Sequence, residues 1–193
     1  MTLQSPSGPA GRAFSFVGGT DGTWRITRSS AVIGAALPEA SRVDVIESMV
    51  ASPPPGALWV LRGVTSNERY VTRPERQLLV ARQPPLGRPE AACAALIPIR
   101  KSASWWDLTQ DERREILETR SEHIKIGLRY LPAVARRLHH SRDLGEPFDF
   151  ITWFEYSPEH AMRFEELVGH LRASEEWKYV DREVDVRLVR GAL

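Results

Sequence analysis

The sequence has one cysteine, no long hydrophobic run and almost no net charge, and each of these shortages excludes a class of protein. A single cysteine, Cys93, excludes a disulfide scaffold and any cysteine-rich zinc or iron–sulfur site. The longest apolar run covers residues 91–99 and contains a proline, so it is too short for a membrane-spanning helix. With 26 basic and 25 acidic residues, the formal charge is +1, which provides no electrostatic attraction for nucleic acid.

The remaining composition is that of a folded protein. The chain has 193 residues, of which 42% are hydrophobic and 26% are charged, enough for one compact domain or two small ones. Residues 1–10 contain neither the basic nor the apolar stretch of a secretory signal. We therefore expect a cytoplasmic protein that binds neither nucleic acid nor membrane.

Proline-rich breaks at 52–56 and 83–89 divide the chain, and the second suggests a boundary near residue 90. After it, a capping box at Thr109 and Glu112 opens a helix that runs to about Arg129, and Ser157-Pro158 opens a second helix. Strands are predicted at 91–101, 134–140, 148–156 and 180–189. The resulting β-α-β-β-α-β order is that of a ferredoxin-like fold.

The first part of the chain shows a reduced version of the same order. Strands are predicted at 13–17, 24–33 and 57–64, and a helix at 74–82. Val43, Ile46 and Val50 are spaced by three and four residues, which predicts a short amphipathic helix over 42–50. The predicted fold class is therefore α+β, with two ferredoxin-like halves at 1–90 and 91–193, antiparallel sheets and helices packed outside (the dimeric α+β barrel type).

Common catalytic motifs are absent from the sequence. It contains no Walker phosphate loop, no G-x-S-x-G and no H-E-x-x-H, and the glycines at 18, 19 and 22 lack the strand–G-x-G-x-x-G–helix context of dinucleotide binding. His139 and His140 are adjacent on a predicted strand and face opposite sides, so they do not form a two-histidine metal site.

Two residues of the second half are candidate site residues instead. His123 lies in the predicted long helix, with Gly127 one turn later. A glycine in a helix interior costs about 1 kcal/mol, but here it would let a flat group approach the backbone beside the imidazole. Arg136 lies between Val134 and Leu138 on a core-type strand face, which is costly unless an anion meets it. The structural alternatives are a partly exposed helical histidine and an arginine paired with a buried carboxylate.

Two further positions complete the pattern. Lys101 ends an apolar strand just before Trp105 and Trp106, where it could hold the carboxylates of a large planar ligand. Glu175 and Glu176 lie at the end of the last predicted helix, where the helix dipole disfavours a carboxylate, so one of them could serve a partner. A snorkelling lysine and a solvated acidic surface are the alternatives. Together the four positions match the needs of a haem pocket that handles a small anion.

Five longer segments resemble the chlorite dismutase family. They read TSNERYVTRPE at 65–75, LIPIRKS at 96–102 followed by two tryptophans, YLPAVARRLHHSRDL at 130–144, PFDFITWFEY at 147–156 and EEWKYVDREVD at 175–185. The resemblance covers nearly the whole chain after residue 15. The short first half is similar to the compact, dimeric lineage of that family.

The resemblance implies a role for each candidate residue. His123 matches the proximal ligand of haem b (iron protoporphyrin IX), Glu176 the carboxylate that accepts its other N–H, and Arg136 the distal arginine. Gln83 falls where the compact lineage has a polar distal residue that contacts this arginine. Four positions match residues near the haem propionates: Asn67, Tyr70, Lys101 and Trp106. Haem binding is thereby assigned to the second half and not to the first.

The implied activity converts chlorite to chloride and dioxygen in a homodimer. The permanently protonated Arg136 would attract the anion and retain transient hypochlorite. Coproheme decarboxylases share the fold but generally lack the distal arginine, and dye-decolorising peroxidases need an acidic G-x-x-D-G loop that residues 19–22 are too short to supply. A haem carrier or sensor, or a haem-free ferredoxin-like dimer, are the non-enzymatic alternatives. A Soret band and chlorite-dependent oxygen release distinguish these functions.

Overall fold

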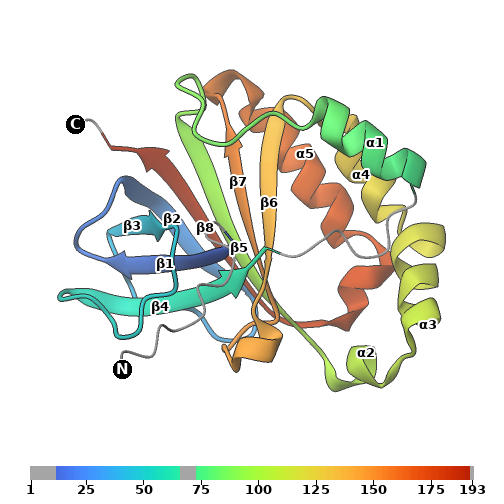
Figure 1. Ribbon diagram of the computed structural model, residues 1–193, viewed down its shortest axis with the longest axis horizontal. Helices are drawn as coiled ribbons and strands as arrows, with labels where there is room; N and C mark the ends of the chain where they lie inside the picture. Colours follow the sequence, from blue (N-terminus) through green and yellow to red (C-terminus); the bar gives the residue numbers. More distant parts are fainter. Residues whose placement is uncertain (1–11, 66–72, 192–193) are drawn as a thin grey trace, which may run out of the picture.

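Eight antiparallel strands form a closed barrel in the computed structural model, which describes residues 12–65 and 73–191 (Figure 1). The strands are β1 (Ala13–Gly19), β2 (Trp24–Ile33), β3 (Arg42–Ile46), β4 (Ala57–Val64), β5 (Cys93–Lys101), β6 (Val134–His140), β7 (Phe150–Tyr156) and β8 (Val180–Arg190). Around the barrel their order is β1-β3-β2-β8-β5-β7-β6-β4.

The barrel consists of two sets of four strands with the same internal order. The N-terminal set runs β4-β1-β3-β2 and the C-terminal set β8-β5-β7-β6. In each set the fourth strand lies beside the first, and the third lies between the first and the second, which is the ferredoxin-like order. The α+β prediction with two ferredoxin-like halves is confirmed. The domain boundary near residue 90 stays a prediction.

The helices are concentrated in the connections of the C-terminal set. β5 and β6 are joined by α2 (Ala103–Asp107), α3 (Gln110–Arg114), the π-helical turn η1 (Glu115–Arg120) and α4 (His123–Arg129). β7 and β8 are joined by η3 (Pro158–His160), α5 (Ala161–Arg172) and η4 (Glu175–Tyr179), while α1 (Arg73–Arg82) precedes β5 and η2 (Arg142–Leu144) follows β6. All five α-helices lie on one side of the molecule, outside the barrel (Figure 1).

Strand alternation creates two apolar layers. Phe16, Leu96 and Trp153 belong to the cluster inside the barrel, whereas Ile97 and Phe154 belong to the cluster between the C-terminal strands and α5. Successive residues of a strand face opposite sides, so neighbours in the sequence enter different layers. Within residues 12–65 and 73–191, no helix is long and apolar enough to cross a membrane.

The helix predicted over 42–50 is wrong, because residues 42–46 form the strand β3. Val43 is fully buried and pairs with Gly18 of β1 and Trp24 of β2. The β-branched residues at 43, 45 and 46 suit a strand. Spacings of three and four therefore arose here without a helix, because pairing with β1 and β2 satisfies this backbone instead.

The long helix predicted from Thr109 to Arg129 is interrupted. Its capping box is present, with Glu112 accepting hydrogen bonds from the backbone and hydroxyl of Thr109. The backbone then widens into η1, where the N–H of Ser121 donates to the carbonyl of Ile116, and Glu122 has a φ of 49°. A left-handed conformation at a non-glycine residue ends a helix, so His123 is the first residue of α4 rather than an interior one.

Candidate active site

A cavity of about 550 Å³ lies between the outer face of the C-terminal strands and the helical layer. Its volume is within the ~300–1,000 Å³ that is usual for ligand and cofactor sites. Strands β5, β6 and β7 supply one wall, and α2, η1, α4, α5 and η4 supply the opposite wall. The lining contains six of the candidate residues named from the sequence: Gln83, Lys101, Trp106, His123, Arg136 and Glu176. The remaining two, Asn67 and Tyr70, lie outside the described residues.

His123 is oriented by a buried carboxylate. Its Nδ1 lies 2.6 Å from Oε2 of Glu176, and the Glu176 side chain is almost fully buried. Since a carboxylate accepts, we assign the Nδ1 proton to this hydrogen bond, which leaves Nε2 unprotonated as a metal ligand. The imidazole of His123 is half-buried, and its exposed part lines the cavity. Glu122, the residue before His123, has a strained backbone. It sets the start of α4 and hence the position of this imidazole.

Glu176 also binds Lys101, whose side chain points into the protein. The Nζ of Lys101 lies 2.8 Å from Oε1 and 3.3 Å from the backbone oxygen of Glu176, and 4.6 Å from the Trp105 ring centre. Burial alone would raise the pKa of Glu176, but His123 and Lys101 outweigh it and lower this pKa to about 2. Lys101 therefore keeps Glu176 ionised, which differs from the expectation that it holds a ligand's carboxylates.

The position of Glu176 in the fold also differs from the expectation. Helix α5 ends at Arg172, and Glu176 lies in the first turn of the separate helix η4. Its backbone N–H donates to the hydroxyl of Ser121, 2.9 Å away. The first turn of a helix favours a carboxylate, so the unfavourable dipole inferred from the sequence does not apply here.

Arg136 extends across the cavity from the strand wall towards α4. On β6 it pairs with Phe154, and both face the helical layer. A Cβ atom placed on Gly127 would lie only 2.3 Å from Nη1 of Arg136. The flat group that Gly127 admits beside the helix backbone is, in this structure, the guanidinium of Arg136.

Gln83 contacts Arg136 through the backbone rather than through the guanidinium. Its Nε2 donates a hydrogen bond of 2.6 Å to the carbonyl oxygen of Arg136. Gln83 follows α1, so this bond fixes the end of that helix against the strand that carries Arg136. The hydrogen bond between the two residues is therefore made to the main chain of Arg136.

Two guanidinium groups that were not singled out from the sequence lie near the ring of Trp106. Arg142 lies 3.9 Å and Arg113 5.0 Å from the centre of its ring. Its Nε1 donates to Asp149, which also accepts from Arg142 at 3.1 Å. These residues come from three separate segments, so no local pattern joined them. The only sequence signal was that Arg142 belongs to the family-like segment 130–144.

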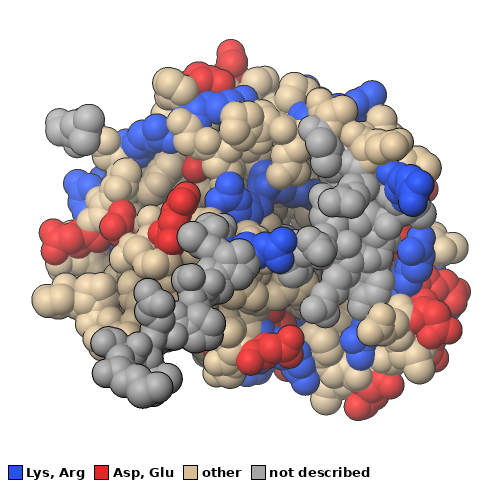
Figure 2. Space-filling model, in the orientation of Figure 1, with Lys and Arg blue, Asp and Glu red and all other residues tan. Residues whose placement is uncertain are grey.

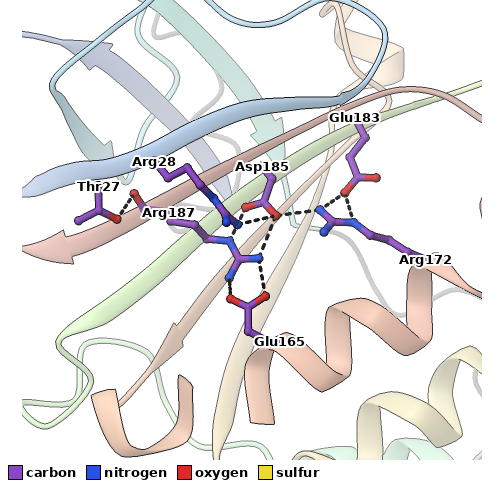
Figure 3. Close-up of polar contacts among 7 residues, drawn as sticks. All are labelled: Thr27, Arg28, Glu165, Arg172, Glu183, Asp185 and Arg187. Atoms are coloured by element: carbon purple, nitrogen blue, oxygen red, sulfur yellow. Dashed lines mark hydrogen bonds and ion pairs between the residues drawn. The ribbon is translucent and has the colours of Figure 1, made fainter. Parts of the chain in front are cut away.

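A network of charged side chains lies between α5 and β8 (Figure 3). The indole N–H of Trp177 donates to Glu183 at 2.8 Å, and Arg172 joins Glu183 to Asp185. Arg187 links Asp185 to Glu165. Arg172 donates hydrogen bonds to both Glu183 and Asp185. Together with Arg187 it balances the buried negative charges of these two carboxylates. The network thereby holds Trp177 and α5 in fixed positions beside the cavity.

A metal ion bound by His123 would need further ligands, and the side chains of the described residues do not supply them. In residues 12–65 and 73–191 there is no group of three or more His, Cys, Asp or Glu side chains placed to hold an ion. A porphyrin brings four nitrogen ligands of its own and requires one imidazole from the protein. The residues of this cavity fit that requirement.

Comparison with known proteins agrees with this chemistry. The family model for chlorite dismutase matches residues 56–190. The chain belongs to the chlorite dismutase family. The dimeric chlorite dismutase of Nitrobacter winogradskyi is 56% identical, with a TM-score of 0.86 over 92% of this chain and 99% of that one.

Two more distant members show how far the similarity extends. The chlorite dismutase of Ideonella dechloratans is 44% identical over 62 residues, which are 32% of this chain and 20% of that protein. The matched segment thus spans about a fifth of that relative. The chlorite dismutase of Candidatus Nitrospira defluvii, in complex with imidazole, has a TM-score of 0.64 at 19% identity over 94% of this chain and 92% of that one. That similarity concerns the fold alone.

Proposed function

We propose that this protein is a haem b-dependent chlorite dismutase, which converts chlorite to chloride and dioxygen. The observation that carries the proposal is the pair formed by His123 and the buried Glu176, facing the same cavity as Arg136. Membership of the chlorite dismutase family and 56% identity to the Nitrobacter protein support it.

The helical wall would hold the cofactor through His123. Haem b, when bound, supplies the iron at which the Cl–O bonds of chlorite break and the O–O bond forms. Glu176 keeps the Nδ1 proton of His123, so that Nε2 stays free to ligate and the imidazole becomes a stronger electron donor. Lys101 acts indirectly, since its ammonium group keeps Glu176 in the carboxylate form.

The strand wall would hold the anion through Arg136. Its guanidinium is charged at every relevant pH, and its planar donors match the oxygens of an oxyanion. Arg136 would therefore orient chlorite and retain hypochlorite close to where it is formed. Gln83 supports this role by fixing the backbone of the strand at Arg136. We assign the propionate side of the haem to Trp106 and, as the sequence suggests, to Asn67 and Tyr70.

Two measurements test the proposal in order. The purified protein, reconstituted with haem, should show a Soret band that depends on His123. It should then release one dioxygen for each chlorite consumed in an oxygen-electrode assay, with stoichiometric chloride. Haem binding without oxygen release would point to a carrier, sensor or decarboxylase, and no haem binding would contradict the assignment altogether.

We also propose that the protein is a homodimer, because the Nitrobacter protein, similar over nearly its full length, is dimeric. Light scattering coupled to gel filtration should give a mass of twice the chain mass of 21.8 kDa. A monomeric mass would contradict this part. The cytoplasmic location expected from the sequence stays a prediction.

A further inference from the structure

Residues whose side chains point to opposite sides of strand β6 line the cavity, which places the cavity at an edge of this strand. Arg136, Arg137 and Leu138 are consecutive residues, and all three line it. Arg136 pairs with Phe154 of the helical-side cluster, whereas Arg137 pairs with Trp153 of the barrel-interior cluster. The cavity must therefore continue around an edge of β6.

The barrel has such an edge where β4 and β6 meet. Seven residue pairs join β6 to β7, but one pair, Val64 with His140, joins β6 to β4 within the described residues. Strand β4 ends at Val64, and Thr65 and His140 line the cavity at this point. The edge of β6 from Val134 to His139 thus has no β4 partner in the part of the chain that the structure describes.

Arg137 is an arginine of the lining at this edge. Its guanidinium packs over the ring of Phe14, 5.0 Å from the ring centre, and its side chain is half-buried. Among residues 12–65 and 73–191, no carboxylate forms an ion pair with it, whereas Arg142, another arginine of the lining, is paired with Asp149. Figure 2 shows Lys and Arg side chains around a hollow in this face of the molecule.

We propose that Arg137 is a second anion-recruiting group of this cavity, which attracts small oxyanions at the seam between β4 and β6 and passes them to Arg136. Arg136 would bind the anion at its destination, and Arg137 would act during its approach. The anion is chlorite only if the proposed function holds, while the charge argument applies to any small monovalent anion.

Charge at the approach to a site changes the rate of association more than the rate of dissociation. One unit charge, acting through water over the width of a cavity mouth, contributes roughly a threefold change in the association rate at low ionic strength. This contribution disappears at high salt, because the screening length falls to ~3 Å at 1 M. A neutral ligand that uses the same cavity should not respond.

The test is the binding of azide and of imidazole to the ferric haem-loaded protein, followed by stopped-flow absorbance. We expect Arg137→Gln to lower the azide association rate about threefold at low ionic strength, with an unchanged dissociation rate and unchanged imidazole kinetics. The difference from the parent protein should vanish in 1 M salt. Arg137→Lys should retain the parent rate, since this role needs the charge and not the planar donors.

Arg25→Gln is the matched control, because Arg25 is an exposed arginine on β2 and does not line the cavity. It should leave all rates unchanged. An Arg137→Gln protein with the parent's azide association rate at low salt would overturn the proposal. So would an equal fall for imidazole or a failure of Arg137→Lys to retain the rate, because either would show that Arg137 acts on the shape of the cavity.

The haem-free protein separates this proposal from the assignment of haem. Trp105, Trp106 and Trp177 line the cavity, so their fluorescence reports on what enters it. Arg137→Gln should lower quenching by iodide but not by uncharged acrylamide. If the protein bound no haem and this difference appeared, the proposed function would fail while the role of Arg137 would stand; equal iodide quenching would overturn the role of Arg137.

Discussion

The two halves of the barrel have the same strand order, and the cavity described above lies against the strands of the C-terminal half. In the C-terminal half, the connections at 102–133 and 157–179 contain helices that stand off the sheet and enclose a cavity. In the N-terminal half, the corresponding connections are residues 20–23 and 47–56. Strand order therefore does not decide where a ligand can bind; the connections do.

The N-terminal half shows why a loop is no substitute for a helix. Ser15 on the outer side of β1 is fully buried, and its hydroxyl donates to the carbonyl of Ser48 and accepts from the N–H of Val50. The loop backbone thus lies directly on the sheet. A helix keeps its axis about 10 Å away because of its side chains, which leaves space for a cavity between two walls.

The largest expected effect tests whether binding is confined to the C-terminal half. His123→Ala should lower haem affinity more than about 100-fold, since loss of a partner that merely orients a ligand already costs 10–100-fold. Titration with haem followed at the Soret band measures this. His170→Gln changes an exposed histidine of α5 outside the cavity and should keep full affinity. Full haem affinity in His123→Ala would place the ligand elsewhere.

The second effect concerns the strand wall of the same half. Arg136→Ala should keep the haem but reduce the number of turnovers before inactivation by about tenfold, because hypochlorite is no longer retained by a fixed charge. An oxygen electrode and a hypochlorite-trapping dye measure the two consequences. Arg136→Lys should be intermediate, since it keeps the charge and loses the planar donors. Unchanged total turnovers with Arg136→Ala would argue against this role.

The third effect is on stability, and it arises in the helical layer that the N-terminal half lacks. Glu176→Gln leaves the buried Lys101 ammonium without its counter-charge and should cost about 3–5 kcal/mol of unfolding free energy. Urea denaturation of the haem-free protein measures it. Combining Glu176→Gln with Lys101→Met should cost less than the sum of the two single changes. Additive costs would show that the pair is not coupled.

The fourth effect is a dependence of stability on pH at the contact between the two halves. Burial lowers the pKa of His139 from 6.5 to about 4, at a position where its ring contacts Phe14 and Phe16 of the N-terminal half. As the pH falls, His139 takes up a proton in the unfolded chain before it does so in the folded protein. The free energy of unfolding should therefore drop by about 3 kcal/mol between pH 6.5 and 4. His139→Leu should remove this slope, whereas the exposed-site control His170→Leu should keep it.

Glu176 should act in a lower pH range. Its folded pKa of about 2 lies below the ordinary 4.5, so its contribution is complete above pH 4.5 and is lost as pH falls towards 2. In haem-free protein, denaturation from pH 7 to 2 should therefore show two successive losses. Glu176→Gln should reduce the lower loss and keep the upper one, and disappearance of both losses in either variant would contradict the assignment of one group to each pH range.

The smallest effect is at the contact between α1 and the C-terminal strands. Gln83→Leu removes one hydrogen bond to the carbonyl of Arg136 and should cost about 1 kcal/mol in urea denaturation. Thr20→Val, which removes an exposed side-chain bond to Asp21 in the N-terminal half, should cost less. A loss above about 3 kcal/mol for Gln83→Leu would show that this bond has a larger structural role than one exposed contact allows.

Local patterns were read correctly wherever one element decides its own structure. The capping box of Thr109 and Glu112 is present, and a helical segment begins after Ser157 with Pro158 in its first turn. Residues 42–46 were misread because their strand depends on β1 and β2. His123 was placed inside a helix because the π-helical turn before it has no propensity signature.

The candidate site likewise has features that the sequence predicted and features that depend on contacts between separate elements. His123, Glu176, Arg136 and Gln83 were named from the sequence and line one cavity. The inward orientation of Lys101 was not predicted. The contacts of the Trp106 ring with Arg113 and Arg142 were not predicted either. Each depends on contacts between separate elements, such as the bond that joins Lys101 to a residue 75 positions away.

The sequence by itself determined most of the strands, the capped starts of two helices, the family and the chemical groups available to a haem and an anion. The tertiary structure decided which groups share a cavity, which carboxylate is kept ionised, and on which side of β6 each arginine lies. The physical reason is that propensity and periodicity act over a few neighbouring residues. Burial, charge compensation and the meeting of β4 with β6 exist only after the barrel has closed.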